Sequence, residues 1–116
     1  MTDTHPYAER IQNVSTVVQV LGAAGHRRSA RVSTRIKSLF RNTEGYTAIG
    51  QDSGAVHVTH TVGLGVPREE QQQALQAALG VYATDLTEAG LTVQEIAVER
   101  PGLPPRRYLS VTRQEA

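Results

Sequence analysis

The sequence contains no cysteine and no tryptophan, and it has a single phenylalanine. Without cysteine there can be no disulfide bond, thiol nucleophile, thiolate zinc site or iron–sulfur cluster built by this chain. The absence also fits a reducing compartment, and we expect a cytoplasmic protein. The core must be built mainly from Val, Leu, Ile, Ala and the four Tyr.

A long apolar run is also lacking. No stretch approaches 18 apolar residues, and the first ten residues, MTDTHPYAER, contain no basic segment followed by an apolar one. We therefore expect neither a membrane span nor a classical secretion signal. Lysine is nearly absent, because Lys37 stands against eleven arginines. A high-GC genome produces this bias, so the excess of arginine over lysine by itself indicates no function.

At 116 residues the chain is long enough for one domain with its own core. Apolar periodicity predicts a first helix that Gly25 ends, and a second helix that begins at Pro67 and that Gly90 ends. Short β-rich runs flank the turn-forming residues 51–54 and predict a hairpin. A last strand pair is expected around RPGLPPR, residues 100–106, which we interpret as a stiff, extended connection rather than a tight turn.

These elements predict a two-layer α+β fold in one domain, residues 1–116. We expect a mostly antiparallel sheet of about five strands with two helices on one face, in the order α-β-β-β-α-β-β. Both helices end in the pattern L-x-x-A-G, at residues 21–25 and 86–90. This repetition favours an internal duplication with halves at residues 6–62 and 67–113, although many unrelated helices also end in Ala-Gly.

The segment RRSARVSTRIKSLFR, residues 27–41, holds six cations and no acid, whereas the whole chain has a formal net charge of only +1. The cations are Arg27, Arg28, Arg31, Arg35, Lys37 and Arg41. We call this group the first basic block. A second basic block follows near the C-terminus and consists of Arg100, Arg106, Arg107 and Arg113. Together the two blocks contain ten of the twelve Lys and Arg residues.

Residues 30–41 fit two patterns. A strand would alternate small or apolar residues with mostly charged ones, whereas a helix would gather the apolar residues into one stripe. We favour the strand, because it places Arg31, Arg35, Lys37 and Arg41 on one face. Like charges two residues apart on such a face lie about 7 Å from each other, given a rise of about 3.3 Å per residue. A negative partner would relieve their repulsion.

Three interpretations of the basic blocks remain open. They contact nucleic acid phosphates or an acidic protein surface, they protect a solvated sheet edge from pairing, or they form ion pairs with the second helix. We expect the first, and nucleic acid as the leading partner. No aromatic residue shares the predicted arginine face, so phosphate contact is more natural than base stacking.

Catalytic patterns are weak. His57 and His60 lie three apart in a predicted strand, so they point to opposite faces and do not share a metal. His60 falls on the apolar face, where we expect a hydrogen-bonded core or edge histidine. Asp85 and Glu88 lie on one helical face and are interpreted as solvating side chains rather than an acid–base pair. We assign no catalytic residue, no metal ligand and no cofactor.

The sequence therefore predicts a small non-enzymatic cytoplasmic protein whose Arg-rich sheet face binds nucleic acid phosphates. The first alternative is a protein-interaction or regulatory module that acts as a homodimer, joined through strand edges or apolar helix faces. A small-ligand-binding domain or an enzyme is the third.

Overall fold

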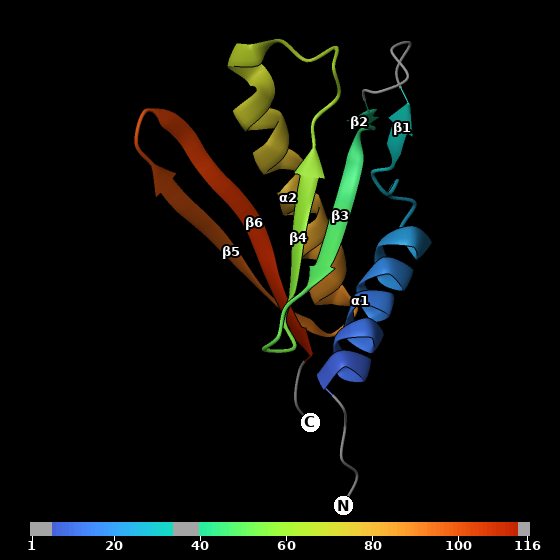
Figure 1. Cartoon of the computed structure of the whole chain (residues 1–116). Coiled ribbons are helices and arrows are strands. Elements are labelled where there is room, and N and C mark those ends of the chain that lie inside the picture. The colour runs from blue at the N-terminus through green and yellow to red at the C-terminus, as the bar shows by residue number, and fades with distance from the viewer. Residues whose placement is uncertain (1–5, 34–39, 114–116) are drawn as a thin grey trace, which may run out of the picture.

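The computed structural model describes residues 6–33 and 40–113 (Figure 1). In chain order, the elements are α1 (Pro6–Ala23), β1 (Arg31–Ser33), β2 (Phe40–Asn42), β3 (Gly45–Gly50), β4 (Val56–Thr61), the 3-10 helix η1 (Arg68–Glu70), α2 (Gln71–Glu88), β5 (Leu91–Arg100) and β6 (Leu103–Arg113). The predicted α+β class is confirmed. No helix within these residues has the length and apolar character needed to cross a membrane.

The main sheet has four antiparallel strands in the order β3-β4-β6-β5. The prediction of about five strands is wrong by one, because the first predicted strand does not join this sheet. The helices, the two central strands and β3 supply side chains to one core. The hairpin β3–β4 comes after α1 and the β1–β2 pair, the hairpin β5–β6 comes directly after α2, and the two hairpins meet where β4 pairs with β6 (Figure 1).

The prediction of one strand over residues 30–41 is also wrong. β1 and β2 pair antiparallel with each other, with Val32 opposite Arg41, and form a two-stranded sheet separate from the main one. Because paired antiparallel segments run in opposite directions, they are not consecutive parts of one straight strand. Residues 34–39, between β1 and β2, lie outside the described residues.

One core cluster joins the helices to a single face of the main sheet. Its buried members are Val17, Leu21, Tyr46, Ala48, Val56, Val58, Leu79, Tyr82, Leu86, Leu109 and Val111. Successive side chains of a strand point to opposite faces, so the buried Val56 and Val58 of β4 face the helices and His57 between them faces away. Within residues 6–33 and 40–113, no helix covers the opposite face of the sheet (Figure 1).

α1 and α2 each have 18 residues and end in the same way. Leu21 and Leu86, which begin the two L-x-x-A-G patterns, are both 0% exposed. Gly25 and Gly90 adopt φ values of 88° and 93°, a conformation that glycine adopts without steric cost. The pattern therefore marks the same kind of helix end in both halves, while the duplication itself stays a prediction.

The β5–β6 connection differs from the expected extended linker. β5 ends at Arg100 and β6 begins at Leu103, so only Pro101 and Gly102 form the turn. Gly102 has a φ of 70°, and a proline followed by a glycine with positive φ is typical of a tight type II turn. The Arg100 guanidinium donates from Nε and Nη2 to the Pro104 carbonyl oxygen at 2.9 and 2.6 Å. These hydrogen bonds hold the tip closed.

Candidate nucleic-acid interface

The first basic block begins where the chain leaves α1 and runs along the outer edge of β3. Ser29 N donates to the Tyr46 carbonyl at 2.7 Å, and Tyr46 N donates to the Arg27 carbonyl at 3.0 Å. Arg28 and Tyr46 thereby form a parallel bridge. The backbone that carries Arg27 and Arg28 is consequently fixed to the main sheet, and its approach to β3 is close.

Gly45 makes this close approach possible. Its φ is 151°, and a Cβ atom at this position would lie 2.5 Å from the Arg27 carbonyl oxygen and 2.7 Å from Ser29 N. Both neighbours are backbone atoms, so a side chain at this position could not be accommodated by a rotamer change. The glycine is therefore needed where residues 27–29 lie alongside the start of β3.

Arg27 and Arg28 project from this fixed backbone into solvent, and both residues are exposed. Within residues 6–33 and 40–113, neither guanidinium forms an ion pair, a hydrogen bond or a ring contact. A rigid backbone with exposed, uncompensated guanidinium groups is a suitable arrangement for binding phosphates. These two residues are the best-defined part of the first basic block.

The other four cations of the block are placed differently from the prediction. In the β1–β2 register Arg31 lies opposite Asn42 and Arg41 opposite Val32. Arg31 and Arg41 are thus on different strands, and they are not alternate positions of one strand as expected. Arg35 and Lys37 lie outside the described residues, so their predicted place beside Arg31 and Arg41 is not described. The base of the pair is tied by Ser29 Oγ, which donates to the Thr43 carbonyl at 2.7 Å.

The second basic block lies on the β5–β6 hairpin, at the opposite end of the strand order from β3 (Figure 1). Arg106 and Arg107 are consecutive in β6, so their side chains point to opposite faces of the sheet. The structure therefore does not bring the two blocks onto one sheet face. The predicted single Arg-rich face is replaced by two separate basic regions.

Most cations of the second block have intramolecular contacts. Arg100 caps the hairpin tip through Pro104, and the Arg106 guanidinium lies 5.7 Å from the centre of the Tyr108 ring. Arg107 Nε and Nη2 donate to the Gln76 amide oxygen at 3.1 Å when that amide is oriented with its oxygen toward β6. Only the exposed Arg113 has no such contact among the residues described.

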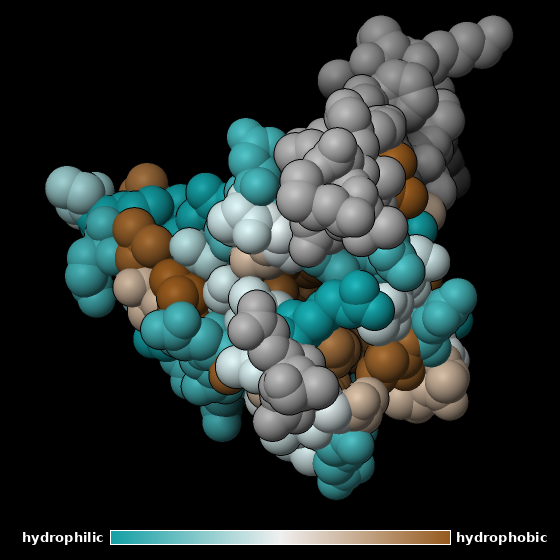
Figure 2. Space-filling view, turned by 90° about the horizontal axis from the view of Figure 1, so that it is seen from below, coloured by the Kyte–Doolittle hydropathy of each residue, from teal (hydrophilic) through white to brown (hydrophobic). Residues whose placement is uncertain are grey.

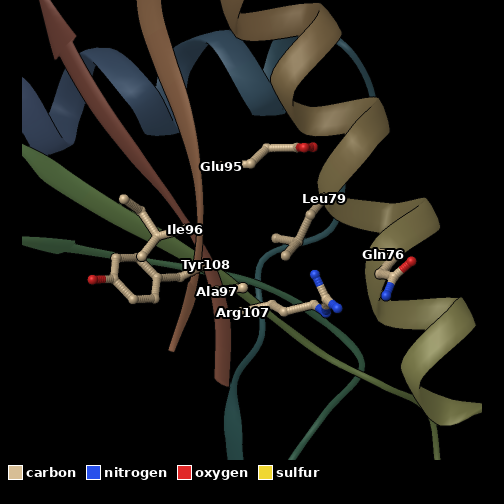
Figure 3. A pocket seen from close by; sticks show the side chains of 7 residues that line it. All are labelled: Gln76, Leu79, Glu95, Ile96, Ala97, Arg107 and Tyr108. Carbon is tan, nitrogen blue, oxygen red and sulfur yellow. The ribbon is translucent and has the colours of Figure 1, made fainter. Parts of the chain in front are cut away.

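Arg107 and Gln76 line an open groove of about 370 Å³ between α2 and the β5–β6 hairpin. Figure 3 shows Arg107 and Glu95 on the side of the hairpin that faces Leu79 of α2, whereas Tyr108 points to the other side of the strands. The hairpin and α2 are thus incompletely packed against each other at this point.

The sequence interpretation missed a cluster of polar and aromatic side chains beneath the first basic block. His26 Nε2 donates to Asp85 Oδ2 at 2.5 Å, and the His26 ring makes an edge contact with Tyr82, with centroids 4.8 Å apart. His60 Nδ1 and the Tyr82 hydroxyl are hydrogen-bonded at 2.7 Å. The cluster ties the segment after α1 to α2 and β4.

The expectation for the two strand histidines is confirmed, since His60 contacts Tyr82 on the helix face and His57 stacks on Tyr108 on the opposite face, with centroids 4.5 Å apart. The His26 backbone N–H donates to the Leu21 carbonyl at the end of α1, at 3.0 Å, while its ring binds Asp85. Asp85 is therefore a structural partner rather than only a solvating side chain.

Burial shifts the pKa values of two members of this cluster, His60 and Tyr82. Desolvation lowers the pKa of His60 below its ordinary value of 6.5, and the Glu44 carboxylate partly opposes the shift. Desolvation, with the Glu44 carboxylate and Tyr46, raises the pKa of Tyr82 to about 12. Near neutral pH the His60 imidazole and the Tyr82 hydroxyl are therefore uncharged. Among the described residues, no three His, Asp or Glu side chains gather to hold a metal ion.

Comparison with known proteins adds no assignment. The chain matches no protein-family model, and no curated protein or solved structure is significantly similar to it.

Proposed function

We propose that the protein is a small non-enzymatic cytoplasmic binding protein that contacts nucleic acid phosphates through the first basic block. The observation that supports the proposal is the exposure of Arg27 and Arg28 on a backbone fixed to β3, without an acidic partner among the described residues. Because this backbone is already fixed, less conformational entropy is lost when a ligand binds. The remaining cations of the block follow along the chain as far as Arg41.

The second basic block has a smaller part in this proposal. Arg100 and Arg107 already donate hydrogen bonds to Pro104 and Gln76, and these contacts would have to break or be shared with a phosphate. Because the block lies at the other end of the strand order, one short duplex need not contact both blocks. Phosphate contacts position a protein without reading base sequence, so we expect little sequence preference.

The test is a binding titration against duplex DNA, duplex RNA and single strands at about 50 and 200 mM salt. Affinity falls with added salt, and each lost phosphate contact makes the slope of log affinity against log salt less steep by about 1. We expect the double variant Arg27→Glu/Arg28→Glu to lose affinity on the order of tenfold or more at low salt. Its slope should be less steep than that of the wild type by about 2. Far-UV circular dichroism checks that the variant is folded.

Arg68→Glu is the matched control, because Arg68 is an exposed arginine of η1 outside both blocks. It changes the net charge in the same direction at a different place, and we expect only a small loss of affinity. Absence of binding to every probe at low salt would overturn the proposal. Equal losses per substitution in the control and the double variant would show that only net charge matters.

A further inference from the structure

β5 is an edge strand without a neighbour on its outer side. Among the described residues β5 pairs with β6 alone, along Leu91–Arg100, and Figure 1 shows it at the border of the sheet, away from α1. The backbone N–H and C=O groups of its outer side are left unpaired. Such a row of donors and acceptors is a template for pairing with another strand.

The outer edge of β5 is only partly protected from pairing. The strand contains no proline and no lysine, and its protective features, three charged residues and a register shift between Val98 and Arg100, lie in its second half. The other edge of the sheet is different, because Arg27–Ser29 lies alongside the start of β3 and α1 packs against this strand. Among the described residues, nothing pairs with the outer edge of β5.

The hairpin that carries this edge is also incompletely supported. The groove between α2 and the hairpin leaves part of its inner side open (Figure 3), and Val98 and Leu103 are 44% and 59% exposed. Viewed from below, apolar and polar side chains alternate in small patches on the side of the molecule where β5 and β6 lie (Figure 2). An isolated two-stranded ribbon is only marginally stable in water, so added pairing would stabilise it.

We propose that β5 pairs antiparallel with β5 of a second copy, across a two-fold axis, to form a continuous eight-stranded sheet. A second copy is the partner that fits, because an edge that pairs with itself uses up the open edge of both molecules. Such an isologous contact closes after two copies, whereas pairing between two different edges would continue into a filament.

The charges of β5 allow this orientation. Residues 91–94 are uncharged, and the three charged residues, Glu95, Glu99 and Arg100, lie in the second part of the strand. Antiparallel pairing centred near Ile96 places the uncharged start of each strand opposite the charged end of the other. Val93 then faces Glu99 of the second copy, and no two carboxylates lie directly opposite each other; the nearest like charges are the Glu95 residues of the two copies, which are diagonal neighbours.

The oligomeric state of the full chain tests the proposal. Light scattering coupled to size exclusion should give twice the 12.6 kDa of one chain at roughly 10–100 µM protein, well above a micromolar dissociation constant. Val98→Lys adds a charge beside the edge at an exposed position, and we expect it to give monomer. Thr92→Lys, also exposed, is a second edge variant should the first fail to fold.

Val81→Lys is the matched control, because Val81 is 50% exposed on α2 rather than on the edge; it should stay dimeric. A monomeric wild type would overturn the proposal. So would edge variants that remain dimeric, or a control that dissociates as they do.

Cysteine cross-linking gives an independent measurement, because the chain has no cysteine of its own. Ile96→Cys should form a disulfide-linked dimer under mild oxidation, since the proposed register places this residue next to its own copy. Val81→Cys should not cross-link at the same rate. Equal rates for the two variants would contradict the proposed register. Self-association and nucleic acid binding are measured separately, so either can fail without the other.

Discussion

Gly45 is the residue on which the position of the first basic block depends. Gly45→Ala would force a Cβ atom against the Arg27 carbonyl and Ser29 N, at 2.5 and 2.7 Å, and would require a positive φ of 151° from alanine. We expect the free energy of unfolding to fall by about 2 kcal/mol or more. Urea denaturation followed by circular dichroism measures this change.

Gly65→Ala is the appropriate comparison, because nothing lies within 4 Å of a Cβ atom at that position and its φ is not in the positive range. Its effect should stay within about 0.5 kcal/mol. Similar losses for the two variants would show that residues 27–29 do not approach β3 as closely as described.

His60 gives a pH dependence with a definite sign. Since burial lowers the pKa of His60 below 6.5, the unfolded chain binds more protons than the folded one between these two pKa values. Stability is therefore fully present above about pH 6.5 and falls as the pH is lowered through the folded pKa. Thermal unfolding at several pH values between about 8 and 5 should show the melting temperature falling on the acid side.

His60→Asn removes the titrating group while leaving a polar partner for the Tyr82 hydroxyl. We expect a flatter dependence of melting temperature on pH for this variant than for the wild type. His57→Asn removes a second histidine whose pKa is lowered, by burial and by Arg106. Comparing the two variants separates the contributions of His57 and His60 to the pH dependence of the melting temperature. An unchanged pH dependence in the His60 variant would contradict a lowered pKa at this position.

At the residue scale, the sequence predicts what alternation alone determines. The opposite faces of His57 and His60 follow from their spacing within one strand. The His26–Asp85 pair joins residues 59 positions apart, and no local pattern indicates which distant carboxylate a histidine will meet. Such a contact depends on how α1 and α2 lie on the sheet.

At the scale of elements, the equivalent ends of α1 and α2 can be compared directly. Leu21 and Leu86 occupy the same place in the L-x-x-A-G pattern, and both are fully buried. We expect Leu21→Ala and Leu86→Ala each to lower the free energy of unfolding by about 3 kcal/mol, from lost apolar burial and the cavity left behind. Urea denaturation of both variants provides the measurement.

Val81→Ala, at a half-exposed position of α2, should change stability by less than about 0.5 kcal/mol. If only one of the two leucine variants were strongly destabilised, the two helix ends would not be equivalent in the core.

The elements that the sequence predicted well have strong local signals. α2 is rich in helix formers with an apolar stripe, and the turn at residues 51–54 is confirmed by a hydrogen bond from Gly54 N to the Gln51 carbonyl at 3.0 Å. The strand at 30–41 failed because alternation is compatible both with one long strand and with two short ones. The second case needs a chain reversal, which alternation does not indicate.

At the scale of the whole molecule, one core predicts one unfolding transition. Tyr46, Val56 and Val58 from the first half pack in the same cluster as Leu86 and Leu109 from the second. We therefore expect far-UV circular dichroism and tyrosine absorbance to follow a single transition, with equal calorimetric and van't Hoff enthalpies. Two resolved transitions would show that the proposed halves fold as separate units.

The arrangement of the basic blocks illustrates what lies beyond prediction at this scale. Both blocks are evident in the sequence, and both follow the end of a helix. Their separation depends on the strand order β3-β4-β6-β5, which places the two helix-to-sheet connections at opposite borders. Strand order is set by the packing of the complete core, so no single segment contains it.

The start of α1 and the end of β6 lie at the same end of the molecule, opposite the hairpin tip and the β1–β2 pair (Figure 1). A fluorescent label, affinity tag or solid support attached beyond either Pro6 or Arg113 would therefore be anchored at the end away from both the hairpin tip and the β1–β2 pair. Immobilised protein would present that end to the solution, whichever terminus carries the anchor.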